Sequence, residues 1–231
     1  MHMTETQLED SVNRASTRVP VPWKNGRGVC FDIFAEPKAP SDFIWELSTA
    51  ELVVSDVPFS HFPGIVRQFC VASGEVVLTV NGVTQTCPEG SITQFDGGSA
   101  TSCCLVDSKP ASALNLMQRR AAEDDTPLLS LEVFSHDAGS SVVPVLLLPE
   151  HSRVEAIVAV TGPATISIKI ANAENDIVSD HVLDLQLLDA LRLSSLRIAA
   201  SEALCQLQLS PSSTSIQLQL QQGRVAVLLH Q

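Results

Sequence analysis

Arg67 is the residue of this sequence best suited to holding a ligand. It alternates with Phe69 and Val71, so a strand here would place all three side chains on one apolar face. A guanidinium on a buried face needs a partner, because its desolvation is otherwise too costly. That partner can be a ligand carboxylate held by two parallel hydrogen bonds. It can equally be an internal carboxylate, for instance that of Asp96 or Glu51.

Two short segments rich in Pro and Gly supply further candidates. Lys24 and Asn25 lie in a Pro-Trp-Lys-Asn-Gly turn, which can place an ammonium and an amide at the rim of a binding site. In the alternative interpretation Asn25 only tolerates the turn backbone and Lys24 is solvated. His61, in Phe-Ser-His-Phe, suits a general base, a metal ligand or a hydrogen-bonded loop residue.

The remaining candidates follow Arg67 in the chain. Asp96, in Phe-Asp-Gly-Gly, can orient a ligand or pair with Arg67, or simply form an Asp-Gly turn. Asn115 and Met117 alternate along one segment and can offer an amide and a thioether, although core packing also suits Met117. The sequence thus nominates six ligand-binding residues and no catalytic one: Lys24, Asn25, His61, Arg67, Asp96 and Asn115.

No metal or other cofactor is expected. Zinc or iron needs three converging N, O or S ligands, and only His61 and Asp96 can be nominated. The two closely spaced histidines, the glutamate and the later histidine of metal-binding cupins are missing, and Thr93 stands where the last would follow Pro88-Glu89-Gly90. The sequence also lacks the two glycine-rich motifs that bind phosphate groups, G-x-x-x-x-G-K-[ST] and a strand-linked G-x-G-x-x-G.

Charge and composition restrict the partners. The 231 residues carry 26 acids and 14 bases, a net charge of −12, which argues against nucleic acid and anionic membranes. A small anion remains compatible, because it needs only one or two cations. The polar start, the lack of an apolar run of about 20 residues and six cysteines without CxxC spacing predict a cytoplasmic protein with free thiols. The oligomeric state is open, with a homodimer as one option.

Alternating patterns predict strands. Residues 68–80 alternate on both sides of Ser73-Gly74 and suggest a hairpin, and residues 165–170 form a further strand. Residues 216–221 and 225–229 form two more strands, separated by a turn at Gln222-Gly223. Residues 5–15 and 116–122 are short helix candidates, and the first could equally be a disordered tail.

A weak internal repeat suggests two related halves, although alternation is common to β proteins and can also produce such a match by chance. Residues 69–74 and 76–80 align at constant offset with residues 157–162 and 164–168. In this alignment Glu155 is the counterpart of Arg67 in the second half. We therefore expect a tail over residues 1–17, one half over 18–120 and a second over 121–231, packed as one unit because each half alone would leave open edges.

Four motifs follow one another in the first half. They are Pro22-Trp23-Lys24-Asn25-Gly26, Pro58-Phe59-Ser60-His61-Phe62-Pro63-Gly64 with Arg67, Phe95-Asp96-Gly97-Gly98, and Asn115-Leu116-Met117 with Arg119-Arg120. Together they resemble the HutD/Ves family of small cupin-like proteins. The resemblance implies an all-β, bicupin-like double jelly roll of two packed β-sandwich halves. It also implies an accessory protein of histidine utilisation that senses or sequesters a small anionic metabolite such as N-formylglutamate.

Three positions depart from the family pattern, which usually carries an acid where this sequence has Val66, Gly98 and Ala113. Their loss leaves the ligand identity open and gives Arg67 fewer internal partners, which favours an external anion.

Two rival functions remain. One is a metal-independent cupin isomerase or lyase acting on a small carboxylate, with His61 as general base and Lys24 or Arg67 polarising the substrate. The other is an interaction module without a ligand. Turnover would identify the first, and binding without turnover would identify the sensing protein.

Overall fold

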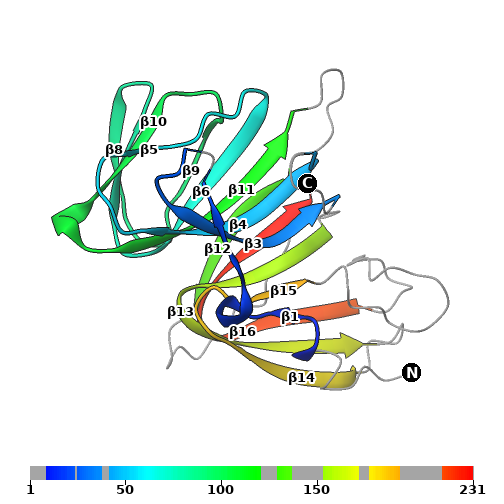
Figure 1. The fold of residues 1–231 in the computed structure, drawn as a ribbon. Helices are drawn as coiled ribbons and strands as arrows, with labels where there is room; N and C mark the ends of the chain where they lie inside the picture. Colours follow the sequence, from blue (N-terminus) through cyan, green and yellow to red (C-terminus); the bar gives the residue numbers. More distant parts are fainter. Residues whose placement is uncertain are drawn as a thin grey trace. The chain divides into compact units, whose positions relative to one another are not determined.

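The computed structural model describes residues 9–23, 25–37, 42–120, 129–136, 153–171, 177–192 and 215–230. Within these ranges the regular elements are strands, the helical residue Glu9 and two three-residue 3-10 helices, η1 (Ala15–Thr17) and η2 (Val106–Ser108) (Figure 1). The all-β expectation is confirmed. The described part of the chain has no helix with the length and hydropathy of a membrane span.

The chain divides into two units. The first unit is Ser16–Leu131, and the second consists of Met1–Ala15 and Glu132–Gln231. In the first unit, one sheet has the order β2 (Pro20–Pro22), β3 (Val29–Glu36), β4 (Trp45–Leu52), β11 (Ala111–Arg119), β6 (Ile65–Ser73) and β9 (Ile92–Asp96). The other has the order β5 (Val57–Pro58), β10 (Thr101–Leu105), β7 (Val76–Val80) and β8 (Val83–Cys87). All described pairings are antiparallel.

The two sheets of the first unit pack face to face. Phe69 and Val71 of β6 share one hydrophobic cluster with Leu78 of β7 and Cys103 of β10. Their burial contributes about 25 cal/mol per Å² of apolar surface removed from water, which holds the sandwich together. The face of the six-stranded sheet that carries Phe69 and Val71 is called the inner face below.

The segment after β6 is not a hairpin. Strands β6 and β7 belong to different sheets, so the chain turns a corner at Gly74 instead of folding back on itself. Gly74 has φ +78°, and a Cβ there would lie 3.0 Å from the Pro110 carbonyl oxygen. The alternating pattern on both sides of Gly74 therefore belongs to two consecutive strands in different sheets, not to a hairpin.

The two short helix predictions are wrong over most of the described residues that they cover. Glu9 is helical, but Val12–Asn13 is strand β1, and residues 5–8 lie outside the described residues. The stretch from Leu116 to Arg119 belongs to strand β11. Five cysteines are free thiols in the structure (Cys30, Cys70, Cys87, Cys103 and Cys104), and Cys205 lies outside the described residues.

The second unit is built around two long strands. Its sheet has the order β1 (Val12–Asn13), β15 (Ala190–Arg192), β13 (Arg153–Ala171), β16 (Ser215–His230) and β12 (Leu129–His136), and β14 (Ile177–Leu185) also pairs with β13. The turn predicted at Gln222-Gly223 is wrong. These residues lie inside β16, at the point where its register against β13 shifts.

Pairing relates the two units. The first part of β13 pairs with β15 and with the end of β16, as β6 pairs with β9 and β11. The last part of β13 pairs with β14 and with the start of β16, as β7 pairs with β8 and β10. Thr161 and Gly162, with φ +65° and +140°, lie in β13 at the position equivalent to Gly74, where the register of β13 against β16 shifts. The strand pairing thus follows the repeat that the sequence suggested.

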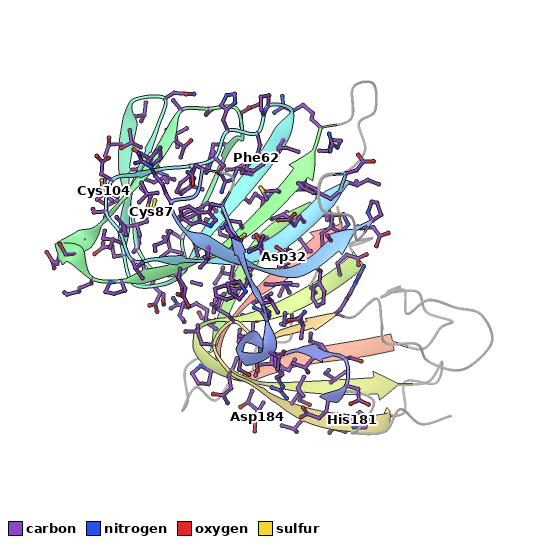
Figure 2. All side chains as sticks on the ribbon, in the orientation of Figure 1. Asp32, Phe62, Cys87, Cys104, His181 and Asp184 are labelled. Carbon is purple, nitrogen blue, oxygen red and sulfur yellow. The ribbon has the colours of Figure 1, made fainter. Side chains whose placement is uncertain are left out.

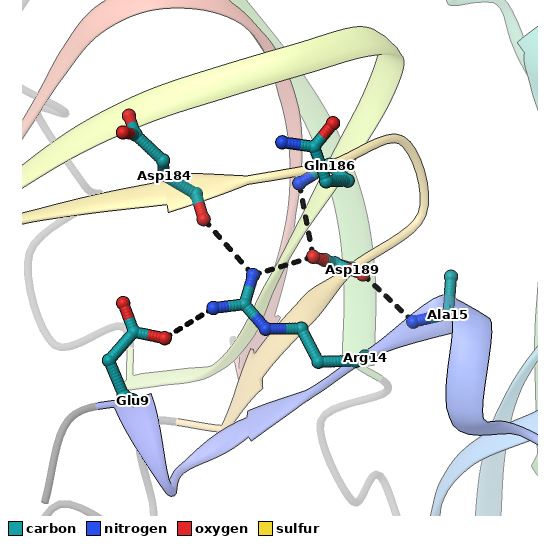
Figure 3. Close-up of polar contacts among 6 residues, drawn as sticks. All are labelled: Glu9, Arg14, Ala15, Asp184, Gln186 and Asp189. Carbon is teal, nitrogen blue, oxygen red and sulfur yellow. Dashed lines mark hydrogen bonds and ion pairs between the residues drawn. The ribbon is translucent and has the colours of Figure 1, made fainter. Parts of the chain in front are cut away.

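The N-terminal segment is tied to the second unit by one arginine (Figure 3). Arg14 Nη1 donates to Asp189 Oδ2 at 2.7 Å and to the Asp184 carbonyl oxygen at 3.1 Å. Asp189 is 2% exposed and also accepts from the backbone N–H groups of Ala15 and Gln186. A buried carboxylate with this many donors is fully satisfied, and these contacts fix the chain directly after β1.

Candidate functional site

The register of the paired strands brings several polar side chains together on the inner face. Directly paired residues share a face, so strand pairing defines two adjacent rows across the sheet. The first row is Phe95, Arg67, Met117, Glu46 and Ala35, and the second is Thr93, Phe69, Asn115, Ser48 and Asp32. Asp32, labelled in Figure 2, lies on β3 and is the last residue of the second row. Of the polar residues in these rows, Asp32, Glu46, Ser48, Arg67 and Asn115 are called the Arg67 cluster.

Arg67 is the buried cation of this cluster. Its side chain is held by Asn115, whose Oδ1 accepts from Nη2 at 2.9 Å. The guanidinium carbon lies 4.8 Å from the Phe59 ring centroid and 5.4 Å from that of Phe95, within cation–π range. The Nε–H is buried, and no acceptor among the described residues bonds it.

Arg67 keeps its charge without an ion pair. Burial lowers the pKa of Arg67 to about 10, while Glu46 and Cys30 act in the opposite direction, so the group is cationic at neutral pH. No described carboxylate forms an ion pair with it. The internal partners considered from sequence do not serve: Glu51 is exposed on the other face of β4, and Asp96 lies 3.6 Å from Arg120. A buried donor is thereby left for an outside acceptor.

Glu46 is the titratable acid of the cluster. Burial raises the pKa of Glu46 to about 7, and the negative charge of Asp32 acts in the same direction. A hydrogen bond from Ser48 and the charge of Arg67 offset part of this shift. Burial, with Asp32 and Glu46 nearby, also raises the pKa of the Cys30 thiol to about 11. The acid side of the cluster thus changes charge near neutral pH.

The turn motif at residues 22–26 has a structural use. Asn25 Nδ2 donates to the Pro58 carbonyl oxygen at 2.7 Å, and its Oδ1 accepts from the Arg27 N–H at 3.0 Å. The Trp23 ring lies over Gly28, where a Cβ would come within 2.8 Å of it. Asn25 therefore joins this turn to the next motif rather than contacting Arg67, and Lys24 lies outside the described residues.

His61 and Asp96 both lie near Gly98 and not against Arg67. A Cβ on Gly98 would lie 2.9 Å from Asp96 Oδ1 and 3.7 Å from His61 Nε2, so both surround this glycine. Asp96 Oδ1 accepts from the Gly98 N–H at 2.7 Å. Asp96 pairs with Val66, which places it on the face opposite to Arg67. Of the six sequence candidates, the structure brings together Arg67 and Asn115.

Sequence reasoning missed the contacts nearest to Arg67. The second and third motifs supply their aromatic rings, Phe59 and Phe95, where their polar residues had been nominated. Glu46, Ser48 and Asp32 were also missed. Ser48 and Glu46 alternate with apolar Trp45 and Leu47, a pattern that usually marks a solvent-facing polar side.

No metal site is formed by the part of the chain that the structure describes. Within it, no three His, Cys, Asp or Glu side chains lie together as a metal ion would require.

Comparison with known proteins agrees with this architecture. The family model described as HutD matches residues 15–200. The chain belongs to the HutD family. Protein Ves of Citrobacter koseri is 35% identical over 100 residues, which are 42% of this chain and 52% of that protein. The match to this curated relative thus spans about half of its length. The HutD/Ves resemblance is confirmed, with the cupin-like fold that it implies.

Solved structures show the same fold at low identity. A conserved protein of unknown function from Pseudomonas aeruginosa, PA5104, aligns with TM-score 0.65 and 20% identity, covering 95% of this chain and 98% of that one. HutD from Pseudomonas fluorescens, solved in a formate condition, aligns with TM-score 0.56 and 20% identity, covering 95% and 97%. Ylba from Escherichia coli aligns with TM-score 0.58 and 11% identity, covering 95% and 89%.

Proposed function

We propose that this HutD family member binds a small carboxylate metabolite through Arg67 and serves histidine utilisation as a sensing or sequestering protein. The observation that carries the proposal is the buried Nε–H of Arg67, which has no acceptor among the described residues. A carboxylate placed against the guanidinium would supply the missing acceptor and neutralise the buried charge. N-formylglutamate is the ligand we propose, in accord with the family.

Several features of the site support a ligand rather than a purely structural arginine. Asn115 fixes the guanidinium from one side and two aromatic rings flank it, so its orientation is set before binding. Membership of the HutD family is consistent with a role in histidine utilisation. We further propose that the two related units form a bicupin-like double jelly roll, and that the protein works in the cytoplasm.

The test is titration calorimetry with N-formylglutamate on three variants. Arg67→Ala should weaken binding about 30- to 150-fold, because a charge-assisted bidentate contact contributes roughly 2–3 kcal/mol. Arg67→Lys should recover little of it, because an ammonium lacks the planar fork. Arg120→Ala, a change at an exposed arginine, is the matched control and should bind normally.

Thermal unfolding without ligand separates the structural alternative. Arg67→Ala should stay folded if Arg67 serves a ligand. A wild type that binds no acidic metabolite of histidine breakdown, beside an Arg67→Ala variant that melts far lower, would contradict the proposal.

One observation favours a second candidate function. Glu46, whose pKa is about 7, lies in the same row as Arg67 and suits a general acid or base better than exposed His61. Such an isomerase or lyase would exchange a substrate C–H for deuterium in heavy water, followed by proton NMR. Exchange with wild type and its loss in Glu46→Gln would favour an enzyme over a sensor.

A further inference from the structure

The Arg67 cluster has two ends of opposite charge. In sheet order, Arg67 on β6 is separated from Glu46 on β4 by one strand, β11, and Asp32 follows on β3. Strands are about 4.8 Å apart, so the Glu46 backbone lies about 10 Å from that of Arg67. Both side chains extend from the inner face, so one small metabolite on this face could contact both charged groups.

Exposure changes along the same line. Arg67 is 8% exposed, Glu46 is half-buried and Asp32 is exposed. A ligand carboxylate at Arg67 would therefore lie at the buried end of the Arg67 cluster, and the rest of the ligand would extend toward Glu46 and Asp32. Ionised acids only accept hydrogen bonds, so a second anionic group at this end would be repelled, whereas an N–H group would be bound.

We propose that the Arg67 cluster selects a carboxylate that also carries an N–H donor, an amino-acid-like or N-acyl amino-acid-like ligand whose nitrogen faces Glu46 and Asp32. This rests on the proposed function, because it assigns the other end of the ligand held by Arg67. Glu46 and Asp32 are here specificity residues, and Arg67 provides the affinity common to all carboxylates.

The charged neighbours of Glu46 give this selectivity a pH signature. Asp32 and the neutral Cys30 thiol lie near it on β3 and Arg67 on β6, while the β11 residue paired with it is Met117. Because the pKa of Glu46 is about 7, the acid end becomes more negative between pH 6 and 8. An ammonium-bearing ligand should then bind more tightly as pH rises, and a ligand with carboxylates alone more weakly.

The experiment compares three probes of one carbon skeleton: glutarate, L-glutamate and N-formyl-L-glutamate. Glutarate lacks the nitrogen, so it is the probe without an N–H donor. By calorimetry, both nitrogen-bearing probes should bind at least about tenfold more tightly than glutarate at about pH 8. Lowering the pH toward about 6 should reduce the ratio of the affinity for L-glutamate to the affinity for glutarate, because Glu46 becomes protonated.

Matched variants locate the effect. Glu46→Gln should remove most of the glutamate preference and flatten its pH dependence, and Asp32→Asn should weaken it. Glu51→Gln changes an exposed acid on the other face of the same strand, so it should behave as wild type. Melting curves confirm that each variant is folded.

The possible results separate this inference from the proposed function. Glutarate binding as tightly as both nitrogen-bearing probes, with Arg67→Ala abolishing all three, would overturn the inference and leave carboxylate binding intact. A preference that survives both Glu46→Gln and Asp32→Asn would also overturn it. No binding of any probe to the folded wild type would overturn the inference and count against the proposed function.

Discussion

At the scale of single residues, Arg67 and Glu46 differ in how the fold uses their charge. Arg67 is almost completely buried but retains its proton at neutral pH, because burial lowers its pKa only to about 10 and the charge of Glu46 acts against that shift. Glu46 is less buried but has a pKa near neutrality, because its partial burial disfavours the charged form and Asp32 adds like charge. The cation is therefore constant at physiological pH, and the acid is the adjustable member.

This difference predicts how Glu46 affects stability with pH. The pKa of Glu46 rises from 4.5 to about 7 on folding, so the folded state keeps the proton to higher pH than the unfolded state. The free energy of unfolding should therefore fall as pH rises through this window. Glu46→Gln should melt like wild type near pH 4.5 and about 2–4 °C higher near pH 8, the shift for about 1 kcal/mol in a half-buried, partly screened group.

Differential scanning calorimetry across this pH range checks the prediction. Glu51→Gln, on the exposed side of the same strand, should show no such pH-dependent gain. A Glu46→Gln variant that is less stable than wild type at about pH 8 would mean that the attraction between Glu46 and Arg67 outweighs the cost of burying the acid.

At the scale of the elements, sequence patterns located strands better than their faces. The alternation around Arg67 correctly placed it with Phe69 and Val71, because β6 has apolar neighbours on its inner face. In β4 the same logic fails. Trp45 and Leu47 are buried on one side, while Glu46 and Ser48 turn toward the inner face.

The inner face of a strand could not be predicted from the sequence for a physical reason. A strand pattern gives the period of burial, but only the neighbouring strands decide which side is inner. Pairing partners are set by long-range contacts that no local window contains, so the meeting of Glu46 with Arg67 was not predictable. The same reason explains the corner at Gly74 that was predicted as a hairpin, because a positive-φ glycine serves either geometry.

A second element-scale feature is the attachment of the N-terminal segment by Arg14, which predicts a stability effect. Arg14→Ala would leave the buried Asp189 carboxylate with backbone donors alone. We expect a loss of about 2 kcal/mol in the free energy of unfolding, the contribution of a hydrogen bond to a charged, buried group. Denaturant titration measures it.

Glu9 provides the control, because it also pairs with Arg14 but lies at the exposed end of the contact. Glu9→Ala should change stability by less than about 1 kcal/mol, as exposed ion pairs do. Equal losses in the two variants would show that the segment is held by something other than Asp189.

At the scale of the whole molecule, the two units share strand pairing but differ at the candidate site. The repeat aligns Arg67 with Glu155, and the pairing of β13 with β16 places Val227 where Asn115 stands. Glu155 is 2% exposed. An acid and a valine cannot reproduce a cation held by an amide, so these two equivalent positions of the second unit lack the group that attracts a carboxylate.

This asymmetry predicts one carboxylate ligand per chain. Calorimetric titration with N-formylglutamate should saturate at a ratio of one, and Arg67→Ala should remove essentially all of that heat rather than half. Glu155→Gln, at the equivalent position of the second unit, should leave both affinity and stoichiometry unchanged if it folds as judged by its melting curve. A ratio of two, or half of the binding surviving in Arg67→Ala, would mean that the second unit binds carboxylates through residues other than the counterparts of Arg67 and Asn115.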